Sequence, residues 1–214
     1  MSIGIVGAGG LGSNVARLLA KSGIAATIAN SRGPESLAGL VGELGPSIKA
    51  GSVEEAASAD IVLVAVRWVD LEKALDRVPA WNGRIVIDGT NAVEFLDPDS
   101  PAAKDPSNPL AAYGIKAIDL GGRQSSEVFR ELVPGARIVK AFNHLDVRVL
   151  PEPEVSGGRR VLFYSGDDVD AKAEVREIIE RTSYFPIDLG GLAVGGLLAG
   201  LPLGPLAGIN FIKI

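Results

Sequence analysis

"IGIVGAGGLGSNVARLLAKSG", residues 3–23, decides how this chain folds. Its first four residues are apolar and three of them are β-branched, which indicates a short buried strand. A glycine-rich stretch follows, where the backbone can turn tightly. Beyond it, apolar residues recur at the spacing of one helical face: Leu11, Val15, Leu18 and Leu19. The segment therefore predicts a strand, a tight turn and a helix.

The same alternation continues along the chain. Apolar runs that predict further strands occupy residues 24–29, 48–52, 60–67, 84–91, 136–143, 160–167 and 184–189. Helical patterns separate most of these runs, and continuously apolar strands indicate a parallel sheet that is covered on both faces. We expect an α/β fold of the doubly wound Rossmann type, with a mainly parallel sheet and a small C-terminal α/β lobe.

Two proline-rich segments interrupt this rhythm. Residues 92–112 carry four prolines and are too long for an ordinary connection, so they predict either a lid or a surface excursion. The stretch "PEPEVSGG", residues 151–158, predicts a boundary. We expect a larger domain over residues 1–150 and a smaller lobe over residues 151–214.

Composition narrows the chemistry that the chain can perform. A net charge of −5 over 214 residues offers no basic surface for nucleic acid or anionic lipid. The chain has no cysteine and one histidine, which argues against thiol chemistry and against a His-rich metal site, so no metal is expected. The lack of cysteine fits a reducing compartment, and no signal peptide is recognisable, so we expect a cytoplasmic protein.

One uncharged stretch, residues 189–212, could be mistaken for a membrane span. It contains seven glycines and two prolines, which would break a helix in lipid. We interpret it as a buried element, a wall of the substrate site or a subunit interface, and we expect residues 190–209 to contribute to a homodimer.

The glycine-rich turn has the spacing G-x-G-x-x-G between a strand and a helix. In that context the first glycine permits the tight turn, the second lets a diphosphate approach the backbone, and the third lets the helix pack on the strand. The free amides at the helix start would bind the diphosphate of a dinucleotide. The predicted contacts are Gly7, Gly9, Gly10, Leu11 and Gly12.

The second predicted strand ends in Asn30, Ser31 and Arg32, where an NAD-selective fold usually has an acidic residue. Two neutral donors and a guanidinium suit a phosphate on the ribose 2′ position. We therefore expect NADP(H) to be preferred over NAD(H), although Arg32 could instead be an ordinary solvated arginine beside a turn.

Ligands of open α/β sheets bind at the carboxyl ends of the strands. The side chains expected there, on the nicotinamide side of the crevice, are Val66, Arg67, Trp68, Thr90, Asn91, Phe142, Asn143 and His144. Trp68 could also belong to the core, and the two asparagines could simply form turns. His144 is either a general acid or a residue at the rim of the site, and we favour the rim.

With these residues in place, the chain resembles the NADP oxidoreductases that depend on the deazaflavin coenzyme F420. The stretches that carry the resemblance are residues 3–23, "ANSRGPESL", "ADIVLVAVRW", "RIVIDGTN", "IVKAFN", "VLFYSGDD" and "GPLAGINFI". The resemblance implies that Gly9, Leu11, Gly12, Ser31 and Arg32 contact the cofactor phosphates. It implies that Val66, Trp68 and Ala141 contact the nicotinamide, and that the deazaflavin stacks beneath C-terminal residues.

The sequence departs from that family at two places. Arg67 stands where proline commonly precedes the tryptophan, and His144 stands where threonine is common among bacterial relatives. The nucleotide-binding half also resembles the NADPH-flavin reductase domain of a metalloreductase family. The expected activity is hydride transfer between NADP(H) and a small-molecule acceptor, either coenzyme F420 or a flavin. Reduction of a small carbonyl, imine or quinone, and a non-catalytic NADP(H) sensor, remain as alternatives.

Overall fold

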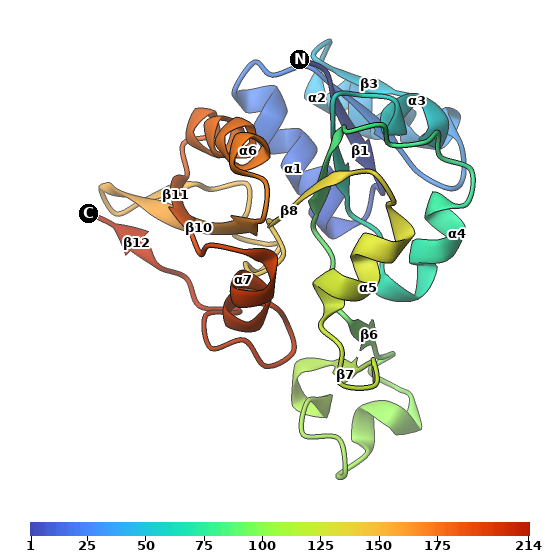
Figure 1. The fold of residues 1–214 in the computed structure, drawn as a ribbon, viewed down its shortest axis with the longest axis vertical. Coiled ribbons are helices and arrows are strands. Elements are labelled where there is room, and N and C mark those ends of the chain that lie inside the picture. Colours follow the sequence, from blue (N-terminus) through green and yellow to red (C-terminus); the bar gives the residue numbers. More distant parts are fainter.

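The computed structural model describes all residues, 1–214, and is built around one ten-stranded sheet (Figure 1). Its strand order is β11-β10-β8-β5-β4-β1-β2-β3, and the short strands β9 and β12 pair with β10. The strands are β1 (Ile3–Val6), β2 (Ala26–Ala29), β3 (Ile48–Ala50), β4 (Ile61–Val64), β5 (Ile85–Asp88), β8 (Arg137–Ala141), β9 (Glu154–Val155), β10 (Gly158–Gly166), β11 (Phe185–Asp188) and β12 (Ile212–Lys213). The α/β fold with a mainly parallel sheet is confirmed.

Helices cover both faces of this sheet. On one face lie α1 (Gly10–Lys21), α2 (Ala38–Leu44) and α6 (Val169–Arg181). On the other lie α3 (Val53–Ala57), α4 (Leu71–Leu75), α5 (Ser125–Leu132) and α7 (Leu192–Ala199). Short 3-10 turns, η1 (Pro34–Leu37) and η2 (Trp68–Asp70), precede α2 and α4.

Alternating side chains of each strand pack into the two apolar clusters, one on each face of the sheet. In β4, Ile61 and Leu63 join the cluster beneath α1 and α6, whereas Val62 and Val64 join the cluster beneath α3, α4 and α5. Successive strand residues point to opposite faces, so a strand that is buried on both sides must be apolar at every position. This is why the strands read as continuous apolar runs in the sequence.

Along the main strand order from β11 to β3, strand direction changes once, between β10 and β8. The strands from β3 to β8 are parallel to one another, while β10 runs antiparallel to β8 and parallel to β11. Residues after 151 thus extend the sheet of the preceding part instead of forming a second sheet. The boundary near residue 151 stays a prediction.

Residues 92–117 form the surface excursion, which projects away from the main sheet in Figure 1. It contains a two-stranded antiparallel sheet of β6 (Val93–Phe95) and β7 (Ile115–Ala117), with the 3-10 turns η3 (Pro101–Lys104) and η4 (Ala111–Tyr113) between them. These two strands are too short to give a periodic signal in the sequence. No helix of the structure has the length and apolar character that crossing a bilayer requires.

Candidate cofactor crevice

The glycine turn between β1 and α1 can be built only from glycines at two of its positions. Gly7 has φ +110°, and a Cβ there would lie 2.4 Å from the carbonyl oxygen of Ala65. A Cβ on Gly12 would lie 1.9 Å from the carbonyl oxygen of Gly7. Both distances are far below van der Waals contact, so any side chain would force α1 away from β1. The turn is therefore held in one tight shape.

The middle of the same turn is open. No atom lies within 4 Å of the position that a Cβ on Gly9 would occupy. The first amide to donate along α1 is that of Ser13, whose N–H donates to the carbonyl of Gly9 at 3.0 Å. The amides of residues 10–12 therefore have no helical partner, and they lie at the positive end of the α1 dipole. Open space beside unpaired amides is what an approaching diphosphate requires.

Leu11 can serve a phosphate only through its backbone. Its side chain reaches toward the end of β5, where its Cδ2 would lie 2.8 Å from a Cβ on Gly89. A Cβ on Gly10 would lie 3.4 Å from Cγ2 of Val147. Both residues thus pack the helix start against neighbouring loops while their N–H groups remain available.

The loop after β2 is shaped by Asn30. Its Oδ1 accepts from the backbone N–H of Arg32 at 2.9 Å, and its Nδ2 donates to the hydroxyl of Ser36 at 2.9 Å. The side chain is nearly buried, at 9% exposure. Asn30 thus orders the loop, and only one amide N–H is left for a ligand. Direct contact of Asn30 with a ribose phosphate stays a prediction.

Ser31 and Arg32 are exposed at the tip of that loop. Neither forms a side-chain hydrogen bond or ion pair within the chain, in contrast to most arginines here, which have carboxylate or carbonyl partners. The guanidinium of Arg32 is therefore free to bind an external anion. Loop order imposed by Asn30 limits the positions that this cation can reach.

The end of β4 lies against the glycine turn. A Cβ on Gly7 would be 3.0 Å from Cγ1 of Val66, so Val66 is adjacent to the bend. Arg67 is exposed and its Nε donates to Asp70 at 2.8 Å, which orients it along η2. Trp68 is half-buried and packs against the core beneath α4. The core interpretation of Trp68 is therefore confirmed, and its contact with the nicotinamide stays a prediction.

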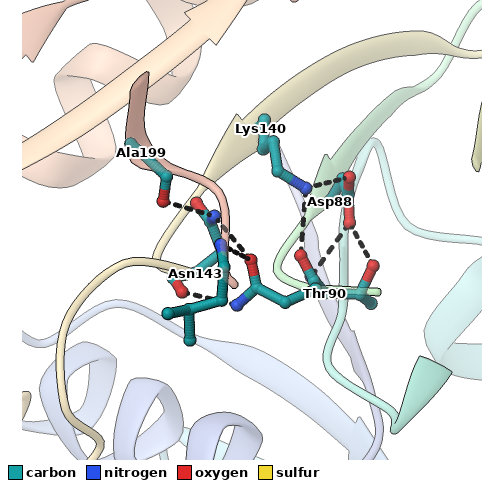
Figure 2. Close-up of polar contacts among 7 residues, drawn as sticks. Asp88, Thr90, Lys140, Asn143 and Ala199 are labelled. Carbon is teal, nitrogen blue, oxygen red and sulfur yellow. Dashed lines mark hydrogen bonds and ion pairs between the residues drawn. The ribbon is translucent and has the colours of Figure 1, made fainter. Parts of the chain in front are cut away.

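The ends of β5 and β8 meet through two asparagines (Figure 2). Asn91 Nδ2 donates to the carbonyl of Asn143 at 2.7 Å, and Asn143 Nδ2 donates to Oδ1 of Asn91 at 3.1 Å. The same side chains also bond to Ala199 and Leu201, in the segment after α7. The two predicted residues are thus brought together, and they join the strand ends to the C-terminal segment.

An ion pair that sequence reasoning missed lies beside them. Lys140 Nζ is 2.7 Å from Oδ2 of Asp88 and donates to the carbonyl of Thr90 at 2.9 Å (Figure 2). Asp88 Oδ1 accepts from both the N–H and the hydroxyl of Thr90, at 2.9 and 2.6 Å. The signal was present in "RIVIDGTN" and "IVKAFN", since an acidic residue directly follows one apolar run and a basic residue directly follows the other.

Comparison with known proteins agrees with this arrangement. Residues 2–92 match the model of the family described as NADP oxidoreductase, coenzyme F420-dependent. This part of the chain is therefore similar to that family. The matched segment extends from β1 to the end of β5, and it includes the glycine turn, the Arg32 loop, Trp68 and Asn91.

Three solved structures with this fold differ widely in how similar they are to the chain. A hypothetical protein of Sinorhizobium meliloti is 39% identical, with a TM-score of 0.87, over 100% of this chain and 97% of that one. A protein of Arthrobacter sp. FB24, whose assignment as an F420-dependent NADP-reductase is provisional, is 24% identical with a TM-score of 0.69, over 90% and 86% of the two chains. A reductive aminase from Aspergillus terreus, solved with NADPH, is 18% identical with a TM-score of 0.61, over 94% and 58%. The last two likenesses concern the fold.

Among curated proteins, metalloreductase STEAP3 of Rattus norvegicus is 28% identical over 204 residues. That match covers 94% of this chain and 36% of STEAP3, so the chain spans about a third of the length of that protein. The metalloreductase resemblance noted in the sequence thus corresponds to one part of a longer chain.

Three residues that were expected at the nicotinamide side of the crevice lie inside the protein instead. Phe142 is 2% exposed and belongs to the core beneath α1 and α6. Ala141 has no exposed surface and belongs to the core beneath α1 and α6. His144 is 1% exposed and packs its ring against Phe163, with centroids 4.9 Å apart. The rim position expected for His144 is therefore wrong. β8 ends in a turn that directs the imidazole beneath β10, which strand order alone could not indicate.

The environment of His144 also sets its protonation. Burial lowers the pKa of His144 from 6.5 to about 4, so the imidazole is neutral near pH 7. Its Nε2 accepts a long hydrogen bond from the N–H of Phe163 at 3.5 Å, and its Nδ1 has no partner. A neutral, enclosed ring in this position is not placed to protonate a substrate in the crevice.

Proposed function

We propose that this protein transfers a hydride between NADP(H) and a flavin-like acceptor, either the deazaflavin coenzyme F420 or a flavin. The observation that carries the proposal is the combination of an open glycine turn with the unpaired Arg32 at the end of β2. The first suits a diphosphate and the second suits a 2′-phosphate on the adenosine ribose. The match of residues 2–92 to a family of NADP-dependent oxidoreductases supports the same cofactor.

In this proposal the protein's main contribution is alignment. NADPH supplies the hydride when bound, and reduction of the acceptor ring takes up that hydride with one proton from water, leaving NADP⁺. Transfer between two stacked rings needs orientation and exclusion of water more than a dedicated acid. Half-buried Trp68 and the strand ends of β5 and β8 are suited to hold the two rings in contact.

The burial of His144 favours this reading over reduction of a carbonyl or imine. Those reactions usually recruit a proton donor in the site, and the chain's one histidine is enclosed and neutral. Likeness to an NADPH-bound reductive aminase keeps the imine alternative open at the level of the fold. A quinone acceptor and a non-catalytic sensor of NADP(H) are the other candidates.

Steady-state oxidation of NADPH tests the proposal directly. The purified chain is incubated with NADPH and, in turn, coenzyme F420, FMN, FAD, simple quinones, ketones and cyclic imines, and absorbance is followed. We expect turnover with F420 or a flavin and much slower turnover with NADH. Turnover confined to ketones or imines would overturn the flavin-like acceptor, and tight NADPH binding without turnover on the whole panel would indicate a sensor.

A further inference from the structure

The segment that follows α7 is attached to the crevice by side-chain amides. Asn143 Nδ2 donates to the carbonyl of Ala199 at 3.2 Å, and Asn91 Oδ1 accepts from the N–H of Leu201 at 2.9 Å. Residues 91 and 201 are 110 positions apart in the sequence, so these contacts fix a remote part of the chain at the strand ends. Figure 2 shows the hydrogen bond between Asn143 and Ala199.

These contacts use most of the hydrogen-bonding capacity of the two asparagines. Both N–H groups of Asn143 are donated, one to Asn91 and one to Ala199, and Oδ1 of Asn91 accepts twice. Asn143 is also buried, at 7% exposure. The polar atoms of the two side chains therefore bond mainly to other parts of the protein. Few of them remain free to bind a cofactor.

The backbone at Phe142, directly before Asn143, is strained, and this conformation sets the direction of the Asn143 side chain. Phe142 has φ +64°, in the left-handed region that a bulky residue rarely adopts. Its ring is buried at 2% exposure, so the packed core holds the conformation in place. Backbone strain of this kind is often retained at functional sites. Here it turns the chain at the end of β8 so that Asn143 faces Asn91.

The far end of the same segment is also anchored. The N–H of Gly208 donates to the carbonyl of His144 at 2.7 Å, and the ring of Phe211 meets the edge of Phe163 at 5.7 Å. Residues 199–208 are thus fastened at both ends to the region around β8 and β10. No residue of this segment is charged, so it offers an apolar and backbone-lined surface.

From this arrangement we infer that Asn91 and Asn143 are positioning residues, which hold residues 199–208 as one wall of the acceptor site. The inference rests on the proposed hydride transfer. An uncharged wall that is rich in glycine and leucine suits a flat, uncharged ring system, and it offers no partner for a carboxylate. Fixing this wall to the ends of β5 and β8 sets the distance between the acceptor ring and the nicotinamide.

Isosteric variants separate positioning from direct cofactor binding. Asn143→Asp replaces both donated hydrogen bonds by a carboxylate that faces two oxygens. Asn91→Asp is milder, because it keeps an oxygen for the N–H of Leu201 and loses only the donation to Asn143. Asn82→Asp introduces the same change in the exposed turn before β5, at the opposite end of that strand, and serves as the matched control.

For each variant the measurements are thermal unfolding, the dissociation constant of NADPH, the KM and kcat with the best acceptor, and hydrogen exchange of the Leu201 amide by NMR. For Asn143→Asp we expect the KM for the acceptor and the exchange rate of Leu201 to rise about tenfold or more, as loss of two hydrogen bonds implies. We expect the dissociation constant of NADPH to change less than about twofold. Asn91→Asp should change the acceptor KM and the Leu201 exchange rate in the same direction, by smaller factors. If Asn143→Asp does not fold, the result for Asn91→Asp tests the inference.

Parallel loss of NADPH and acceptor affinity would overturn the inference, because it would make the asparagines direct cofactor ligands. Unchanged exchange of Leu201 in both variants would overturn it as well. If the wild-type chain reduces no acceptor at all, the proposed function fails. The exchange rate of Leu201 and the NADPH affinity still decide whether the asparagines hold the segment.

Discussion

Lys140 and Asp88 form an ion pair of 2.7 Å with 2% and 0% of their side chains exposed, directly behind the strand ends that form the crevice. Each charge is removed from water, and each depends on the other and on Thr90 for compensation. The pair joins β5 to β8 close to the ends of both strands, next to the residues that belong to the candidate site.

Removing one partner of this pair should destabilise the fold strongly. We expect Asp88→Leu to lower the free energy of unfolding by about 3 to 5 kcal/mol, because Lys140 would be left buried without its counter-charge. The double variant Asp88→Leu with Lys140→Met should recover at least about 2 kcal/mol of that loss. Urea unfolding measures both, and Glu180→Gln, which breaks an exposed pair with Arg176, should cost less than about 1 kcal/mol. A double variant that is no more stable than the single one would contradict this account.

Alanine at Gly12 should mainly lower stability, whereas alanine at Gly9 should mainly weaken NADPH binding. Gly12→Ala places a Cβ 1.9 Å from the carbonyl of Gly7, so we expect it to lower stability by about 1 to 3 kcal/mol or more. Gly9→Ala meets no atom within 4 Å and should cost only a few tenths of a kcal/mol, as a poorer helix cap. We expect Gly9→Ala to weaken NADPH binding about tenfold or more, since the methyl enters the space that the diphosphate needs. Unfolding curves and calorimetric titration with NADPH check the pair, and unchanged NADPH affinity in Gly9→Ala would count against the proposed diphosphate site.

Arg32 should distinguish the two dinucleotides. We expect Arg32→Ala to weaken NADPH binding by about 1 to 3 kcal/mol and to leave NADH binding nearly unchanged, because only NADPH carries the 2′-phosphate. Arg181→Ala, at the C-terminal end of α6, is the control for a general change in charge. Fluorescence titration with each dinucleotide gives the two affinities. Equal losses for NADPH and NADH would refute the assignment of Arg32.

His144 should make stability depend on pH in a defined window. Its pKa is about 4 when folded and near 6.5 when unfolded, so the unfolded chain binds the extra proton first as the pH falls. The stabilisation is complete above pH 6.5 and is lost between pH 6.5 and pH 4, by about 2 to 3 kcal/mol. The difference in unfolding free energy between wild type and His144→Phe should therefore be flat above pH 7 and change within that window. A flat difference down to pH 4 would show that the ring is not buried in solution.

The same histidine separates the candidate activities. Under flavin-type transfer we expect His144→Ala to have a mild effect on kcat once the remaining folded fraction is taken into account. Reduction of a carbonyl or imine with His144 as proton donor predicts complete loss of turnover while NADPH still binds. Steady-state kinetics with circular dichroism as a folding check gives the answer.

Association through the C-terminal segment is a further proposal. Val194, Leu197, Leu203 and Ile214 are 54%, 63%, 80% and 94% exposed, and together they place much apolar surface on a small lobe. We expect a homodimer at micromolar concentration, and Leu197→Asp should shift it toward monomer. Val169→Asp changes a valine on α6 that is 74% exposed, more than Leu197, and should leave the state unchanged. Sedimentation velocity that finds only monomer in the wild-type chain would rule the proposal out.

The sequence by itself determined the order of strands and helices, the parallel character of the sheet, the glycine turn and the placement of Arg32 after β2. These are local properties, since period, apolar runs and backbone freedom are set by neighbouring residues. The tertiary structure decided what depends on contacts between distant residues. It paired Lys140 with Asp88 and Asn91 with Asn143, it enclosed His144 beneath β10, and it fastened Leu201 to Asn91. Whether a polar side chain faces a ligand or another part of the chain is settled by packing of segments that can be 110 residues apart or more, and no local pattern contains that information.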